Sequence, residues 1–203
     1  MSRLEDLIRE LCPDGVKKIS LGEMEKKHII ELGRGKVISK KTLAEKPGNY
    51  PVYSSSALGK GLFGYYGEYM FSDERITWSI DGGGKFFYRH PHRYSVTNVS
   101  GWLKVHDSSI LSIQYLFYTL DNEWSKKHFD YIKKAHPSVI REEYLVPVPP
   151  LPVQREIVRI LDQFTELTAE LTAELTARVK QFEYYKFDLL NFEDSEISYM
   201  QLD

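Results

Sequence analysis

The sequence predicts a mixed α/β globular domain followed by one long helix. Residues 16–146 alternate short β-branched and aromatic runs with glycine-containing turns, a pattern typical of strands joined by loops. Prolines between positions 147 and 152 fix φ and remove backbone donors, so a helix is expected to start only after Pro152. No Gly or Pro occurs beyond that point, and apolar residues recur there at helical spacing. The predicted organisation is an N-terminal helix over 1–12, a globular domain over 13–150, a helical segment over 151–190 and a flexible tail over 191–203.

The N-terminal part is expected to contain a short amphipathic helix and two strand-like patches. The helix over Ser2–Leu11 is favoured because Ser2 is a capping residue and the aliphatic residues share one face. Cys12–Gly15 ends it with a proline and a glycine. Val16–Met24 and Ile29–Ile38 carry the strand-like runs. Four basic residues near the second patch either contact phosphate or are simply solvated: Arg34, Lys36, Lys40 and Lys41.

The segment from Asn49 to Phe71 combines serines, glycines and aromatic residues. It contains the pattern Gly-x-Gly-x-x-Gly from Gly59 to Gly64, but tyrosines follow where a dinucleotide-binding fold requires a helix. The better interpretation is a glycine-rich loop between strands, whose lack of side chains would permit close approach to a duplex. The short donors that this loop offers to a duplex are Ser54, Ser55, Ser56 and Lys60.

Ile76–Ile80 is a β-branched and aromatic run that predicts a buried strand. It leads into Asp81–Lys85, whose glycines and lysine do not have the spacing of a phosphate-binding P-loop. Phe86–Val96 is then expected to form a hairpin arm. Its arginines and histidines beside tyrosines suit contact with base edges in a DNA groove, whereas a metal site at His90 and His92 lacks further ligands. The candidates for base contact are Lys85, Arg89, His90 and Arg93.

The following part of the domain carries a second basic segment. Val99–Val105 predicts another strand, and Ser112–Leu120 predicts a helix or a strand whose aromatic residues belong to the core. A lysine-rich, aromatic-spaced stretch follows and ends at Pro137. Its candidates for DNA contact, mainly with the phosphate backbone, are Lys133, Lys134 and His136.

Beyond Pro152 the apolar residues follow the alternating four- and three-residue spacing of a coiled coil. At about 1.5 Å per residue the helix is expected to be on the order of 50 Å long, too long to be covered by a domain of this size. A Glu-Leu-Thr-Ala unit occurs three times between Glu166 and Ala177, and each unit adds about 6 Å of helix, as in a spacer. An ordinary solvated surface helix is the alternative. The ten positions of this seam are Ile157, Leu161, Phe164, Thr168, Leu171, Leu175, Arg178, Phe182, Tyr185 and Leu189.

The charge is distributed unevenly along the chain. Residues 26–141 contain 18 Lys and Arg against 10 Asp and Glu, whereas residues 142–203 contain 5 against 13. A basic domain joined to an acidic helix fits a phosphate-facing part and a protein-facing part, although charges also segregate by chance on solvated surfaces. The single cysteine, Cys12, excludes a disulfide framework and a Cys-based zinc site. Without a signal peptide or a membrane-length apolar run, a cytoplasmic location without membrane association is expected.

Two stretches resemble a known family. Val146–Ala177 with Lys180–Leu190 closely resembles the conserved helical region of the DNA sequence-specificity subunit (S subunit) of type I restriction-modification systems. Leu11–Met24 resembles the entry into that family's target recognition domain. The resemblance covers most of the chain and is loose in the middle. Members with two recognition domains are roughly twice as long as this chain, which resembles a half-length form.

The resemblance implies that the globular part is a target recognition domain for one half of a bipartite site in double-stranded DNA. It also implies that the long helices pair as an antiparallel coiled coil, set the distance between two domains and dock the methyltransferase (M) subunits, with the restriction (R) subunit joining through the complex. A half-length chain is expected to form a homodimer through Ile157, Leu161, Phe164, Leu171, Leu175 and Phe182.

The same resemblance implies that the chain is not an enzyme. The sequence contains no methylase, helicase or nuclease motif, so no cofactor is expected in this chain and S-adenosylmethionine is expected only in the partner methyltransferase subunit. Two alternatives remain. One is a regulatory protein that captures the methyltransferase subunit without recognising DNA, and the other is a stand-alone enzyme with a cryptic site.

Overall fold

The computed structural model describes residues 2–55, 61–130 and 132–191. The chain forms two compact units that divide after Val158. The first unit therefore includes the N-terminal helix and the first eight residues of the long helix, whereas the sequence placed the end of the globular domain at residue 150. The second unit begins at Arg159, inside that helix.

The globular unit mixes short helices and strands. Its helices are α1 (Arg3–Leu11), α2 (Leu21–Lys26), α3 (Lys40–Glu45), α4 (Ile113–Trp124) and α5 (Pro137–Glu143). Its strands are β1 (Lys18–Ser20), β2 (Ile30–Arg34), β3 (Tyr50–Tyr53), β4 (Leu62–Tyr66), β5 (Arg75–Ser79), β6 (Phe86–Arg89), β7 (Ser95–Val96), β8 (Ser100–Val105) and β9 (Leu145–Pro147). Together with α6 (Leu151–Leu190), these elements confirm the mixed α/β class with a long helix at the C-terminal side.

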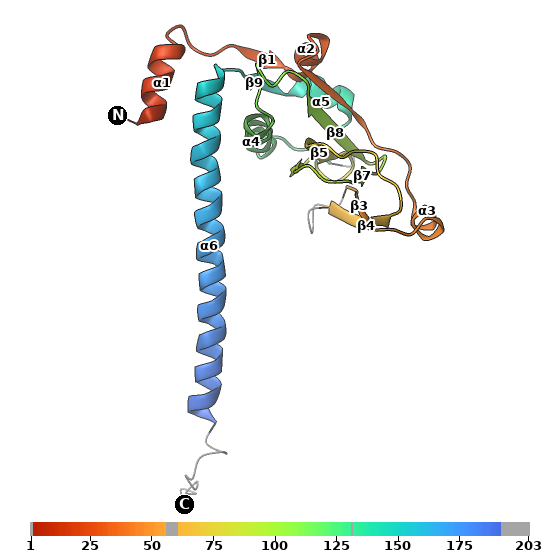
Figure 1. Cartoon of the computed structure of the whole chain (residues 1–203), viewed down its shortest axis with the longest axis vertical. Helices are drawn as coiled ribbons and strands as arrows, with labels where there is room; N and C mark the ends of the chain where they lie inside the picture. Colours follow the sequence, from red (N-terminus) through yellow and green to blue (C-terminus); the bar gives the residue numbers. More distant parts are fainter. Residues whose placement is uncertain (1, 56–60, 131, 192–203) are drawn as a thin grey trace, which may run out of the picture. The chain divides into compact units, whose positions relative to one another are not determined.

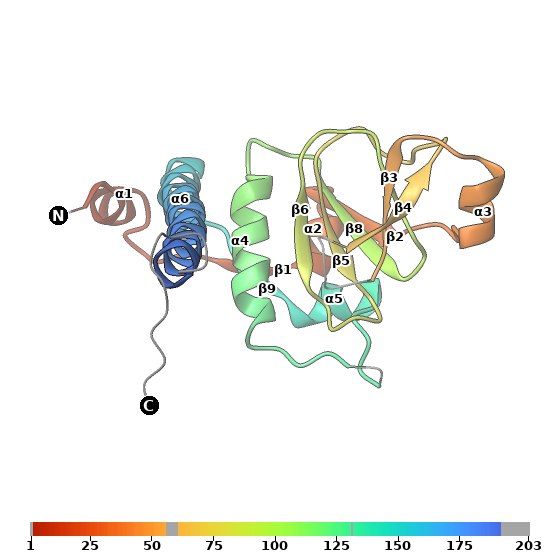
Figure 2. The same ribbon diagram turned by 90° about the horizontal axis from the view of Figure 1, so that it is seen from below.

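Three sheets organise the strands. The largest has the order β2-β8-β5-β6 with antiparallel neighbours, and α4 packs beside β6 and β5 (Figure 2). A second sheet has the order β4-β3-β7, in which β3 pairs antiparallel with β4 and parallel with β7. A third, two-stranded sheet pairs β1 with β9 and so joins the two ends of the domain.

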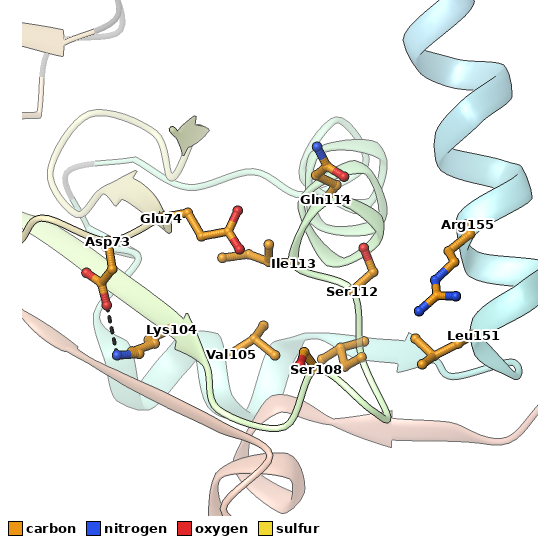
Figure 3. Close-up of a pocket in the computed structure, with 11 residues that line it drawn as sticks. Asp73, Glu74, Lys104, Val105, Ser108, Ser112, Ile113, Gln114, Leu151 and Arg155 are labelled. Atoms are coloured by element: carbon orange, nitrogen blue, oxygen red, sulfur yellow. Dashed lines mark ion pairs between the residues drawn. The ribbon is translucent and has the colours of Figure 1, made fainter. Parts of the chain in front are cut away.

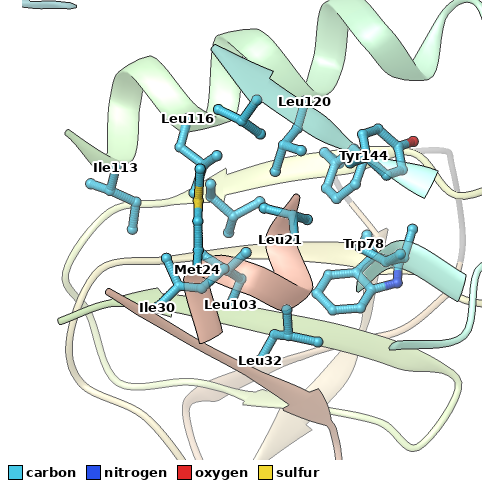
Figure 4. Packing of buried hydrophobic residues seen from close by; sticks show 14 of the residues in the cluster. Leu21, Met24, Ile30, Leu32, Trp78, Leu103, Ile113, Leu116, Leu120 and Tyr144 are labelled. Carbon is cyan, nitrogen blue, oxygen red and sulfur yellow. The ribbon is translucent and has the colours of Figure 1, made fainter. Parts of the chain in front are cut away.

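The main core lies between the four-stranded sheet and the helices α2, α4 and α5. Every residue of β5 is buried, as expected for the predicted strand over 76–80. Trp78 lies in this core with Met24, Leu103 and Leu116 (Figure 4). The Trp78 indole N–H also donates a 2.8 Å hydrogen bond to the Ala135 carbonyl, which satisfies the one polar atom of a fully buried ring. A separate small cluster of Ile38, Val52 and Tyr66 supports the β4-β3-β7 sheet.

Two local predictions within the globular unit were wrong. Residues 21–26 form helix α2 rather than a strand, because the Ser20 side chain caps Glu23 N–H and Leu21 and Met24 face the core from one side of the turn. Residues 86–96 do not form a hairpin of their own. β6 pairs with β5 and β7 pairs with β3, so the two halves of this segment belong to different sheets.

Helix α6 is one uninterrupted helix from Leu151 to Leu190 (Figure 1). It begins before Pro152 rather than after it, since a proline near the start of a helix removes an N–H that has no intrahelical acceptor. The residues from Asp162 to Leu190 are all exposed. The predicted flexible tail begins at residue 191, and its residues 192–203 lie outside the described part of the chain. Among the described residues, no helix is both long and apolar enough to cross a membrane.

Candidate nucleic-acid interface

The glycine turn between β5 and β6 holds Lys85 in a defined place. Gly84 has φ +78°, a conformation that side chains rarely adopt, and a β-carbon there would overlap the Phe129 ring. The Trp124 indole N–H donates to the Gly83 carbonyl at 2.7 Å. The Lys85 ammonium lies 5.8 Å from the centroids of both the Phe87 and Trp124 rings. The turn therefore packs against Phe129 and Trp124, and its lysine lies over two aromatic rings.

The second basic segment lies beside this turn. Ala135 N–H donates to the Ile80 carbonyl at 3.1 Å, and the Lys134 ammonium is 3.0 Å from an Asp81 carboxylate oxygen. Lys133 pairs with Glu143 at 2.7 Å, and this hydrogen bond lowers the pKa of the Glu143 carboxyl. His136 is the N-cap residue of α5. The lysines of this segment are thus ion-paired, and exposed pairs of this kind contribute at most about 1 kcal/mol.

The serine loop after β3 meets the same turn. The Ser79 hydroxyl donates to the Ser55 carbonyl at 2.8 Å, and the Ser54 hydroxyl accepts from Thr97 at 2.9 Å. A β-carbon at Gly82 would overlap the Ser55 carbonyl, so the close approach of the two loops requires glycine there. Ser56 and Lys60 lie outside the described residues. The structure therefore brings together six of the sequence candidates: Ser54, Ser55, Lys85, Lys133, Lys134 and His136.

Arg89 does not present its guanidinium to a ligand in this conformation. The residue is only 4% exposed, and its Nε–H donates to the Thr77 hydroxyl at 3.0 Å. Its guanidinium carbon lies 3.6 Å above the centroid of the Tyr53 ring. Burial lowers the pKa of this arginine to about 10. The side chain is instead an internal support beneath Tyr53, the last residue of β3 before the serine loop.

Tyr53 connects this support with the segment after β6. Its hydroxyl and the His92 Nε2 atom are 3.1 Å apart, and His92 Nδ1 lies 2.6 Å from the His90 carbonyl. A carbonyl only accepts, so Nδ1 carries the proton and a neutral His92 accepts from Tyr53 through Nε2. The His92 ring stacks on buried Tyr94 with centroids 4.6 Å apart. From the sequence, His92 was considered only as a metal ligand, and its contacts with Tyr53 and Tyr94 were not predicted.

Arg93 and His90 are exposed basic residues of that segment. An Arg93 N–H donates to the Tyr50 hydroxyl at 3.1 Å, and the guanidinium lies 5.1 Å from the centroid of Tyr69. The hydrogen bond to Tyr50 raises the pKa of Arg93, so its guanidinium is positively charged. His90 packs edge-on against Tyr88 with centroids 4.8 Å apart. The tyrosine partners were not predicted from the sequence, although five tyrosines between positions 50 and 69 were a signal of an aromatic surface.

A hollow of about 480 Å³ lies elsewhere on the globular unit, beside the start of α6 (Figure 3). Its lining includes Ile113 and Leu151 as apolar residues and Arg155 as a cation. Asp73 and Lys104 form a 2.8 Å ion pair on its far side. None of the sequence candidates for DNA contact lines this hollow.

Most residues of the predicted dimer seam are exposed on α6. Phe164, Leu175 and Phe182 are each 64% exposed and Leu171 is 57% exposed. Leu161 is half-buried, and Ile157 packs against the core of the globular unit. An uncovered row of large apolar side chains is unfavourable in water, since burying each contributes about 1.5–3 kcal/mol.

Comparison with known proteins identifies the family. Residues 13–181 match the family model described as type I restriction modification DNA specificity domain. A putative type I specificity subunit of Mycoplasma pneumoniae is 35% identical over 171 residues, which cover 80% of this chain and 55% of the relative. The MpnII type I restriction enzyme specificity subunit of the same organism is 32% identical over 173 residues, covering 81% of this chain and 51% of the relative. The chain spans about half the length of these relatives.

Solved structures share the fold. The type I restriction-modification S subunit from M. genitalium superimposes with a TM-score of 0.61 at 15% identity, covering 88% of this chain and 46% of that one. The HsdS subunit from Thermoanaerobacter tengcongensis gives 0.61 at 18% identity, covering 91% and 49%. The family-model match over residues 13–181 shows that the chain belongs to the family of type I restriction-modification DNA specificity domains, and the relatives named above are specificity subunits.

Proposed function

We propose that this chain recognises one half of a bipartite DNA site as a homodimer and docks type I methyltransferase subunits, with the restriction subunit joining through the complex. Four segments carry the DNA-facing part: the serine loop after β3, the glycine turn at Lys85, the segment containing Lys133 and Lys134, and the connection between β6 and β7 that contains His90 and Arg93. Their contacts with one another support a common surface. The exposed seam of α6 supports the dimer, because pairing with a second copy would remove its large apolar side chains from water.

The basic and aromatic character of the loops favours DNA over another ligand. Lys85 lies over two aromatic rings and Arg93 beside two tyrosines, so both cations are oriented rather than freely rotating. An oriented arginine can contact guanine bidentately, and lysines and hydroxyls suit phosphate oxygens. We place Arg93 and His90 at base edges and Lys133, Lys134 and Ser54 at the backbone.

The decisive experiment combines the chain with the type I methyltransferase subunit of the same organism. Adenine methylation mapped across a host genome is expected to reveal one split, palindromic motif, because a symmetric dimer carries two identical recognition domains. A stable complex that adds no methylation would instead favour the regulatory protein that captures the methyltransferase without recognising DNA. S-adenosylmethionine is expected to be required, bound by the methyltransferase subunit.

Charge reversal of Arg93 tests the recognition surface directly. Arg93→Glu is expected to abolish motif-specific methylation while leaving the complex with the methyltransferase intact. Lys26→Glu, an exposed residue at the end of α2, is the matched control for charge reversal and is expected to retain methylation. Equal activity of both variants would remove Arg93 from the DNA-facing surface.

A further inference from the structure

The turn between β7 and β8 carries Asn98, a half-buried asparagine whose side chain the fold does not use. Asn98 does not have the positive φ that asparagine tolerates in tight turns. Its side-chain amide forms no hydrogen bond within the described part of the chain. The turn is closed by the backbone instead: Ser100 N–H donates to the Thr97 carbonyl at 3.0 Å, and Ile80 N–H donates to the Val99 carbonyl at 2.9 Å. Neither backbone conformation nor capping therefore requires an asparagine at this position.

The turn is held between the serine loop and the connection from β2 to α3. Thr97 N–H donates to the Tyr53 carbonyl at 2.9 Å, and the Thr97 hydroxyl donates to the Ser54 hydroxyl at 2.9 Å. Lys36 N–H donates to the Val96 carbonyl at 3.1 Å. The C=O of one strand residue and the N–H of the next point to opposite edges of the strand, so the two segments hold the turn from opposite sides.

The connection from β2 to α3 brings two exposed cations to the turn. Arg34 and Lys36 form no ion pair with a carboxylate among the residues that the structure describes. The Arg34 Nε–H donates to the Asn98 carbonyl at 2.6 Å, which leaves the other guanidinium N–H groups for a ligand. The Trp102 indole N–H donates to the Arg34 carbonyl at 3.0 Å. A β-carbon at Gly35 would overlap the backbone of the turn, so this close approach requires glycine.

The chemistry of these side chains differs across the turn. Cations and hydroxyls suit phosphate oxygens, and they flank the turn as Ser54 on one side and Arg34 and Lys36 on the other. Asn98 is neutral and combines one acceptor with two donors in one plane. That combination matches adenine, whose N6 amine donates and whose N7 accepts at the major-groove edge. The order of phosphate donor, amide and phosphate donor is the order of backbone, base and backbone across a DNA groove.

We propose that Asn98 contacts the edge of an adenine in each half-site, and that Arg34 positions Asn98 by holding its carbonyl. The adenine N6 amine donates to Asn98 Oδ1, and Asn98 Nδ2–H donates to adenine N7. The inference rests on the proposed function and names one base that the domain recognises. Asn98 was not a candidate in the sequence, because an isolated asparagine carries no motif.

Replacing Asn98 by alanine tests this contact in the full chain combined with the methyltransferase subunit. Methylation mapped across a genome is expected to lose the requirement for one A·T pair in each half-site, with discrimination there falling about 10- to 100-fold and the other positions unchanged. Gln114→Ala is the matched control. It removes an exposed amide beside the hollow that none of the sequence candidates lines, and it is expected to keep the whole motif.

Asn98→Asp is a second variant of the same shape, and it is expected to lose the same preference because a carboxylate cannot donate to N7. Thermal unfolding and complex formation with the methyltransferase subunit check that both variants are folded. An unchanged motif in folded Asn98 variants overturns the proposal, whether or not methylation becomes slower, because a phosphate contact affects all sequences equally. A wild-type motif that specifies no A·T pair in its half-sites overturns it as well.

An altered base tests the atoms of the contact. DNA with 7-deazaadenine at the position found by mapping lacks the N7 acceptor, and its methylation by the wild type is expected to be about tenfold slower. Asn98→Ala is expected to methylate both DNAs equally fast, since it makes no contact with N7. Equal slowing of the wild type and the variant overturns the contact.

Arg34→Lys tests the positioning role, because it keeps the charge but removes the Nε–H that holds the turn. It is expected to relax the same base position as Asn98→Ala, to a smaller extent. Slower methylation with an unchanged motif would overturn the positioning role of Arg34. A wild-type chain that supports no methylation at all contradicts the proposed function and this inference with it, whereas a wild-type motif kept by the Asn98 variants contradicts this inference alone.

Discussion

Two arginines four positions apart have opposite environments. Arg89 is buried on Tyr53 and bonded to Thr77, whereas Arg93 is exposed and bonded to Tyr50. Through Tyr53, Arg89 supports both the serine loop and His92. An exposed arginine contributes to binding by its own contacts, but a buried one contributes by fixing the positions of others. The two residues are therefore expected to respond differently to salt.

Replacing Arg89 by lysine is expected to lower DNA affinity about tenfold, because a flexible ammonium cannot stack on Tyr53 as a planar guanidinium does. The slope of log affinity against log salt concentration is expected to stay unchanged, since no phosphate contact is lost. Arg93→Lys is the comparison at an exposed site. Titrations of target DNA at several salt concentrations measure the slope, and thermal unfolding checks that the variant is folded. A reduced slope for Arg89→Lys would mean direct phosphate contact.

Glu25 makes a pH-dependent contribution to the stability of the globular unit. Arg141 donates two hydrogen bonds to this carboxylate, at 2.6 and 3.0 Å, and they lower the pKa of Glu25. Because the pKa of Glu25 is lower in the folded state, its ionised carboxylate stabilises the fold at pH values above the ordinary glutamate pKa of about 4.3. This stabilisation is lost as the pH falls through the folded-state pKa. Glu25→Gln is therefore expected to cost about 1 kcal/mol at pH 7 and much less at pH 3.

Urea unfolding of the wild type and the Glu25→Gln variant at both pH values measures this difference. Glu23→Gln is a suitable control, because Glu23 contacts Lys27, an exposed lysine four residues away, rather than a distant residue. An unchanged difference between pH 7 and pH 3 would show that the charge of Glu25 does not stabilise the domain.

At the level of elements, α6 makes its threonines compatible with an apolar seam. The hydroxyls of Thr165, Thr168, Thr172 and Thr176 each donate to the carbonyl four residues earlier, at 2.7–2.9 Å. Because these donors are satisfied inside the helix, the threonine methyl groups are free to pack against a partner. The repeat therefore combines helix continuity with a surface that tolerates burial.

Leu171→Lys with Leu175→Lys is expected to give a folded monomer, because four charges would be buried at the centre of the dimer. The matched control is Ala173→Lys with Ala177→Lys, which adds the same charge at the same spacing on the opposite face of the helix. Sedimentation is expected to show a monomer for the first variant and a dimer for the second. Monomers in both cases would mean that charge, and not the seam, controls association.

For the whole molecule, the length of α6 is expected to set the distance between the two recognition domains. Deleting Glu170–Ala173 shortens each helix by about 6 Å, comparable with one or two base pairs at about 3.4 Å per pair. The two half-sites in the methylation motif are expected to stay the same while their spacer shortens. Glu170→Gln with Thr172→Gln keeps the length and is expected to keep the spacer. An unchanged spacer after deletion would exclude the helix as its determinant.

The amino-acid sequence by itself determined the long helix, the strand over 76–80 and the mixed class. Helix formation over 151–190 depends on local propensity and on the spacing of apolar residues. A β-branched and aromatic run such as Ile76–Ile80 is favoured as a buried strand. The family was also visible at the two ends of the chain, where motifs are contiguous. The spacing of seam residues depends only on helical geometry, so the seam could be predicted without knowing the tertiary structure.

Only the tertiary structure decided which basic residues face outward. Arg89 and Arg93 are equivalent in the sequence pattern, but β6 pairs with β5 and places Arg89 over Tyr53, whose strand belongs to another sheet. Likewise, Ser55, Gly82 and Lys134 meet because sheet pairing brings distant loops together. Burial is a property of contacts between residues far apart in the chain, so spacing along the sequence cannot specify it.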